Sequence, residues 1–184
     1  MASAPPPRMS SPLEGPAQPP KRSTPIGLII AVAIVCSCGA LIVIFAAILF
    51  PVFAQARRAA QSARCISNLR QLGASVNLYA SDFDGHFPDP KNWMDEVSRI
   101  KSRPRFRCPA VAGSQYGFAF NKDLAGKKVS QVEPSHELIF DSNLLERNAN
   151  SGLESLPSPG RHGFGGRAVN HILHVDGSVE SRTN

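Results

Sequence analysis

The chain has 184 residues, a net charge of +6 and 42% hydrophobic residues. The length leaves about 100 residues for a folded domain once a polar tail and an apolar segment are set aside, so we expect a single modest domain. The positive charge is not accompanied by a basic and aromatic patch or by a recognition motif, and we therefore expect no nucleic-acid partner.

Residues 1–25 contain half of the sixteen prolines and few large apolar side chains. Such a segment cannot bury a core and is predicted to be a disordered tail. Its proline clusters could also contact a partner as an extended polyproline helix, but a solvated spacer is the favoured interpretation.

Residues 26–50 carry no charged side chain. As a helix, this segment would be about 37 Å long, which exceeds the roughly 30 Å of a bilayer's hydrocarbon core. We therefore predict a single transmembrane helix and a lipid bilayer as its first partner. Basic residues flank both ends of the segment, so charge alone does not set its orientation.

Two alternatives to an intact anchor remain open. The sequence Ala54-Gln55-Ala56 resembles a signal-peptidase site, although the apolar run is longer than the 7–15 residues of a usual signal peptide. Cys38 could be the acylated residue of a lipoprotein, but the chain stays apolar for twelve residues after it.

Residues 51–85 change to a one-sided pattern that predicts an amphipathic continuation of the same helix. The helix is expected to run from Ile26 to about Ser81, with a kink at Pro51 and a stop near Gly85. The predicted apolar stripe comprises Val52, Ala56, Ala59, Ala63, Ile66, Leu69, Gly73, Val76 and Ala80.

Several segments together resemble bacterial type IV pilin-like (prepilin-type, or pseudopilin-like) proteins, and more narrowly a family of unknown function with a C-terminal His…Asp-Gly signature. The resemblance covers about residues 47–182, with the signature at His162, Asp176 and Gly177. The usual prepilin cleavage motif is missing, and residues 26–50 contain no Glu. The matching segments are Ala47-Ile-Leu-Phe-Pro-Val-Phe-Ala-Gln-Ala-Arg57, Cys65-Ile-Ser-Asn-Leu-Arg-Gln-Leu-Gly73, Tyr79-Ala-Ser-Asp-Phe-Asp-Gly-His-Phe-Pro88, Phe106-Arg-Cys-Pro109 and Tyr116-Gly-Phe-Ala-Phe-Asn121.

The resemblance implies an α+β fold, in which the amphipathic half of the long N-terminal helix packs on a small antiparallel sheet. It also implies a location in the cytoplasmic (inner) membrane, with the tail in the cytoplasm and the head, residues 86–184, on the outer side. Other pilin-like subunits that contact the N-terminal helix are an implied partner.

Local patterns in the head predict its elements. Asp89 and Pro90 are typical of a helix start, and Trp93, Val97 and Ile100 would share one face of a short helix. Residues 148–166 are expected to form a mobile loop. Strands are predicted at residues 116–121, 137–141, 168–175 and 178–182, with Asp176-Gly177 as the hairpin turn between the last two.

The candidate sites are few. Cys65 and Cys108 could pair as a disulfide in an exported head, and two unpaired thiols are the alternative. Asp82, Asp84 and Asp89 could hold Ca²⁺, but a capped turn explains them better.

The histidines of the C-terminal region form no recognisable metal or catalytic motif, and we expect them to be polar surface and turn residues. They are His162, His171 and His174. We therefore predict no catalytic residue, no metal and no cofactor.

Together these patterns predict a non-catalytic, single-pass membrane protein. Its expected role is a pilin-like or pseudopilin-like structural or assembly component of a type II secretion-like or pilus-like system. The alternative is a membrane-anchored extracytoplasmic binding or receptor module that does not polymerise.

Overall fold

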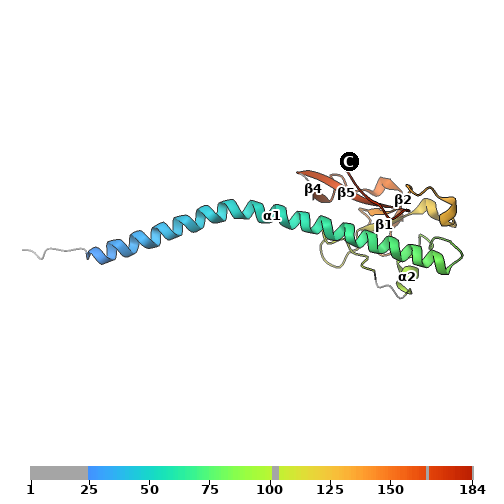
Figure 1. Cartoon of the computed structure of the whole chain (residues 1–184), viewed down its shortest axis with the longest axis horizontal. Coiled ribbons are helices and arrows are strands. Elements are labelled where there is room, and N and C mark those ends of the chain that lie inside the picture. The colour runs from blue at the N-terminus through green and yellow to red at the C-terminus, as the bar shows by residue number, and fades with distance from the viewer. Residues whose placement is uncertain (1–24, 101–103, 165, 184) are drawn as a thin grey trace, which may run out of the picture. The chain divides into compact units, whose positions relative to one another are not determined.

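A computed structural model describes residues 25–100, 104–164 and 166–183 (Figure 1). The predicted tail at residues 1–25 lies almost wholly outside this part of the chain. The chain divides into two compact units, Met1–Ala46 and Ala47–Asn184. The second unit contains the folded head, and the helix α1 runs through both.

Helix α1 spans Ile26–Asp82 without interruption, which confirms the predicted single helix. Pro51 lies inside it and does not end it. By length and composition α1 is able to cross a membrane, and the most apolar part of it is not buried against any other part of the described chain.

The second part of α1 packs on a sheet of six strands and supplies one wall of the main core (Figure 1). Cys65, Leu69, Leu72 and Val76 are completely buried. The predicted stripe is buried from Leu69 onward and half-buried at Ile66, but its earlier positions, residues 52, 56, 59 and 63, are exposed. The sheet does reach residues 58 and 62, where a Cβ on Gly163 would lie 3.5 Å from Arg58 and where Ser62 contacts His171, so Ala59 and Ala63 face away from it.

The strand order is β3-β1-β2-β5-β4, and β6 also pairs with β5. The expectation of an antiparallel sheet is wrong for one pair, since β1 and β3 run parallel. The fold is therefore α+β with a mixed sheet. The strands are β1 (Phe118–Asn121), β2 (Glu137–Asp141), β3 (Asn150–Ser151), β4 (His162–Phe164), β5 (Arg167–His174) and β6 (Val179–Arg182).

The short helix α2 spans Trp93–Ser98, with Asn92 rather than Asp89 at its N-cap. Asp89 instead accepts a hydrogen bond from the Lys91 amide, which forms a local turn before the helix. The Trp93 indole is buried and donates to the Ala149 carbonyl at 3.0 Å, so α2 is attached to the strand side of the core.

The prediction that residues 148–166 form a loop is wrong for part of the segment. This segment holds β3, β4 and the short 3₁₀ helix Leu153–Ser155. Strand β4 pairs with β5 from His162 to Phe164. Glycine and proline in the segment suggested a loop, but strand partners that lie elsewhere in the chain order it.

The hairpin between β5 and β6 lies where it was predicted, but its connection is not the predicted two-residue turn. Strand β5 ends at His174 and β6 begins at Val179, and the Gly177 amide donates to the His174 carbonyl at 3.0 Å. Gly177 has a φ of +84°, which lies in the left-handed region that glycine adopts readily. Asp176 Oδ1 accepts a hydrogen bond from the Ser178 amide at 2.8 Å. These two residues of the predicted signature therefore have a structural role in the turn.

Candidate functional site

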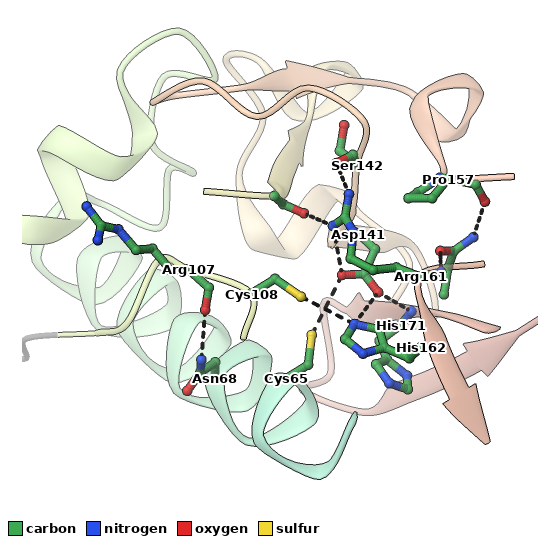
Figure 2. A network of polar contacts seen from close by, with 12 residues as sticks. Cys65, Asn68, Arg107, Cys108, Asp141, Ser142, Pro157, Arg161, His162 and His171 are labelled. Atoms are coloured by element: carbon green, nitrogen blue, oxygen red, sulfur yellow. Dashed lines mark hydrogen bonds and ion pairs between the residues drawn. The ribbon is translucent and has the colours of Figure 1, made fainter. Parts of the chain in front are cut away.

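Four buried side chains from four different segments meet between α1 and the sheet (Figure 2). Cys65 comes from α1, Cys108 from the segment before β1, Asp141 from the end of β2, and His162 from the start of β4. One nitrogen, oxygen or sulfur atom from each lies within 4.8 Å of the corresponding atom of every other. All four side chains are at most 2% exposed.

The individual distances are short and converge on one region. Cys108 Sγ lies 3.3 Å from His162 Nε2, and Asp141 Oδ2 lies 3.3 Å from the same nitrogen. Cys65 Sγ lies 3.7 Å from Asp141 Oδ1. We call these residues, Cys65, Cys108, Asp141 and His162, the four-residue cluster.

Asp141 is held in place by its neighbours. Its Oδ2 accepts a hydrogen bond from the His171 backbone amide at 2.8 Å, and Arg161 Nη1 lies 3.4 Å from its Oδ1. Arg161 is fixed in turn, because it donates to the carbonyls of Gly117 at 2.6 Å and Ser142 at 2.5 Å. The carboxylate thus has a defined orientation and a buried positive partner.

His171 lies beside the cluster and stacks on His162 at a ring-centroid distance of 4.5 Å. Its two ring nitrogens contact Ser62 Oγ at 2.8 Å and Ser181 Oγ at 2.9 Å. Burial lowers the pKa of His171 to about 4, so the ring is neutral at pH 7. Because both ring nitrogens of His171 contact serine hydroxyls, His171 does not join the cluster as a further donor and instead packs against His162.

Within the cluster, Cys108 tends to be negatively charged and His162 positively charged. The hydrogen bond with Cys65 and the contact with His162 lower the pKa of Cys108 to about 5, although burial opposes this. Burial also opposes the positive charge on His162, but hydrogen bonds to Asp141 and Cys108 outweigh it and raise the pKa of His162 to about 9. At neutral pH the cluster therefore contains a thiolate and an imidazolium.

This geometry differs from that of a nucleophilic Cys-His-Asp triad. In such a triad the carboxylate orients the histidine through the nitrogen that does not face the nucleophile. Here Cys108 and Asp141 both approach Nε2, while the buried Nδ1 of His162 has no hydrogen-bond partner among the described residues. The sulfur atoms are also closed off from substrate by burial. Convergence of donors on one point is typical of a metal centre.

Cys65 and Cys108 were predicted as a possible pair, and the structure places them close together as free thiols. Their pairing as a disulfide stays a prediction. The expectation that His162 and His171 are polar surface residues is wrong, because they are 2% and 0% exposed. Of the predicted signature, only His162 belongs to the cluster.

Asp141 was missed altogether. It ends a strand whose other residues are mostly apolar, and a carboxylate at that position was the available signal. The Ca²⁺ alternative is not supported, since Asp82, Asp84 and Asp89 are exposed and do not enter a metal-ligand group within the described ranges.

A second feature is a cleft of about 890 Å³ on the head. Four exposed arginines line it, together with Tyr116 and residues of α1; they are Arg64, Arg105, Arg107 and Arg147. Arg107 and Arg147 lie over the Tyr116 ring, at 5.5 and 5.8 Å from its centroid. Arg147 also forms an ion pair with Asp95. The cleft is therefore strongly basic and has an aromatic wall.

Comparison with protein-family models, with curated proteins and with solved structures found no match to this chain. The resemblance to pilin-like proteins consequently stays a prediction.

Proposed function

We propose that this protein is a single-pass, membrane-anchored structural or assembly subunit of the pilin-like type. Its N-terminus would lie in the cytoplasm and its head on the outer side of the cytoplasmic membrane. The main observation in support of this proposal is that α1 has two parts with different surroundings. Its first part is apolar and uncovered, whereas its second part forms the core of the head.

The small residues of α1 next to the apolar segment support a role in assembly. Ala56, Ala59 and Ala63 are exposed, although the sequence pattern predicts them on the apolar side. Small side chains allow two helices to approach closely. This alanine face is therefore the surface on which we expect a second helix to pack.

The buried cluster is consistent with a non-catalytic role. None of its reactive atoms lines the cleft of the head. A group that touches no solvent cannot bind substrate without a rearrangement, so the cluster fits a structural purpose.

Orientation and assembly can be tested with one added cysteine in a background that carries Cys36→Ser and Cys38→Ser and keeps the buried Cys65 and Cys108. Asp176→Cys places a thiol in an exposed turn of the head. A membrane-impermeant maleimide should label it in intact spheroplasts. Labelling that requires opened membranes would contradict the proposed orientation.

Assembly predicts helix-to-helix cross-links at the alanine face. Ala59→Cys and Ala63→Cys should give dimers with a short bis-maleimide, while Arg57→Cys on the opposite side of α1 should give few. Equal yields at all three positions, or none, would contradict packing through the alanine face.

The arginine-lined cleft supports a second candidate, an anchored module that binds an anionic ligand. Arginine recognises carboxylate and phosphate groups through paired hydrogen bonds. A polyglutamate peptide should then bind the purified full-length chain, with affinity reduced by Arg105→Glu and by Arg107→Glu. Binding that is unchanged in both variants would exclude this candidate.

A further inference from the structure

The four-residue cluster has the ligand types and the spacing of a tetrahedral zinc site. Thiolate, imidazole and carboxylate are the three side-chain ligands that zinc uses in proteins. Zinc bond lengths imply ligand separations of about 3.8 Å between two sulfurs, about 3.6 Å from sulfur to nitrogen or oxygen, and about 3.4 Å from nitrogen to oxygen.

Three observed separations are close to these values. Cys65 Sγ lies 3.7 Å from Asp141 Oδ1, and Cys108 Sγ lies 3.3 Å from His162 Nε2. His162 Nε2 lies 3.3 Å from the other carboxylate oxygen, Asp141 Oδ2. The two sulfurs lie within 4.8 Å of each other.

We propose that Cys65, Cys108, Asp141 and His162 form a structural Zn²⁺ site that joins helix α1 to the sheet of the head. All four positions of a tetrahedral ion are filled by protein atoms, which is the arrangement of a structural rather than a catalytic zinc. The proposal does not depend on the role in assembly.

Charge and surroundings favour the ion. Zinc binding would displace the protons of the Cys65 thiol and the His162 ring. In that state two thiolates and one carboxylate contribute three negative charges, which are balanced by the two positive charges of zinc and the one of Arg161. Asp141 is also held by the His171 amide, an outer contact of the kind that fixes metal ligands in orientation.

A disulfide between Cys65 and Cys108 is the competing state. It would use two of the four side chains and would leave unexplained why a carboxylate and an imidazole are buried against the sulfurs. A metal ion uses all four. It also ties together four segments that are far apart in sequence: α1, the segment before β1, the end of β2 and the start of β4.

The experiment uses the full-length chain purified in detergent. Metal analysis of the purified protein should find about one zinc per chain. After removal of metal under reducing, anaerobic conditions, added Co²⁺ should produce the visible bands of a tetrahedral cobalt-thiolate centre, and one equivalent of Zn²⁺ should abolish them. This measurement needs no variant that could fail to fold.

The variants Cys65→Ser, Cys108→Ser, Asp141→Asn and His162→Gln should each lower zinc affinity by more than the roughly 10–100-fold typical of an outer-contact substitution. Asp176→Asn and Cys36→Ser are the matched controls, because they change a carboxylate and a thiol outside the cluster. Both should retain wild-type zinc content. The fluorescence of Trp93, the only tryptophan, reports whether each variant is folded.

Three results would overturn the proposal. The first is a wild-type chain that, after reduction, binds neither Zn²⁺ nor Co²⁺. This result counts against the proposal whether or not the protein was isolated with a Cys65–Cys108 disulfide. Unchanged zinc content in the Asp141→Asn or His162→Gln variant would also overturn it. Equal zinc loss in the controls would show that the ion is bound elsewhere.

Discussion

The two parts of helix α1 share one backbone conformation but meet different surroundings. Residues 26–50 are apolar and exposed on every side of the helix, whereas from Ser62 onward one side is buried against the head. A helix that is apolar all round needs an apolar environment on all sides, and a one-sided helix needs only a partner on one face. The chain itself supplies the second environment, and a bilayer is the predicted source of the first.

The largest expected effect tests the environment of the first part. Ile34→Lys combined with Leu41→Lys should abolish membrane association, because two lysines in mid-span cost about 5–7 kcal/mol together. The measurement is the distribution of full-length chain between membrane and soluble fractions after carbonate washing.

The matched control places two lysines at the same spacing in the second part. Ser67→Lys with Ala74→Lys alters exposed positions and should leave membrane association unchanged. Retention of the first variant in the membrane would remove the basis for a transmembrane segment at residues 26–50.

The next effect tests the partner of the second part. Leu72 is completely buried in the main core, and Leu72→Ala should lower the free energy of unfolding of the head by about 2–5 kcal/mol. Denaturant unfolding in detergent, followed by Trp93 fluorescence, measures this. Leu78→Ala on the same helix should cost less than about 1 kcal/mol, since Leu78 is 42% exposed. Equal costs would contradict the observed packing face.

A smaller effect concerns the distance between helix and sheet. A Cβ on Gly73 would lie 3.0 Å from Leu173 Cδ2. Gly73→Val should therefore crowd this contact and destabilise the head by about 1–3 kcal/mol. A Cβ on Gly39 would have nothing within 4 Å, so Gly39→Val should leave unfolding of the head unchanged. If the Gly73→Val head is as stable as the wild-type head, the helix can move away from the sheet.

The smallest effect concerns one hydrogen bond. Asn68 Nδ2 donates to the Arg107 carbonyl at 2.9 Å and so links α1 to the segment that carries Cys108. Asn68→Ala should cost about 0.5–1.5 kcal/mol in the same unfolding experiment. Asn77→Ala, at an exposed position of the same helix, should change stability by less than about 0.5 kcal/mol. Faster amide exchange around Arg107 in the Asn68 variant would locate the effect.

Local patterns predicted those elements that depend mainly on local chemistry. The helix from Ile26 to Asp82 follows from an unbroken run of helix-compatible apolar and then one-sided residues. The position of the β5–β6 hairpin follows from Asp176-Gly177, because glycine readily adopts the positive φ that Gly177 has in this turn. Strand β2 was predicted with the bounds that the structure has.

Other features depend on partners that lie far away in the sequence. Strand β4 lies in a segment rich in glycine and proline, and its order comes from pairing with β5. The parallel pairing of β1 with β3 likewise depends on how the chain returns to the sheet. Exposure of Ala59 and Ala63 was not predictable from period alone, because it depends on which side of α1 the sheet covers.

The sequence alone was sufficient to establish a long helix with an apolar first part, since hydrophobicity and charge are properties of adjacent residues. It also supplied the two thiols outside the apolar segment. Only the tertiary structure decided that Asp141 and His162 join those thiols in one buried cluster. The four residues are separated by up to 97 positions, and only the packing of α1 on the sheet brings their donor atoms to within 4.8 Å of one another.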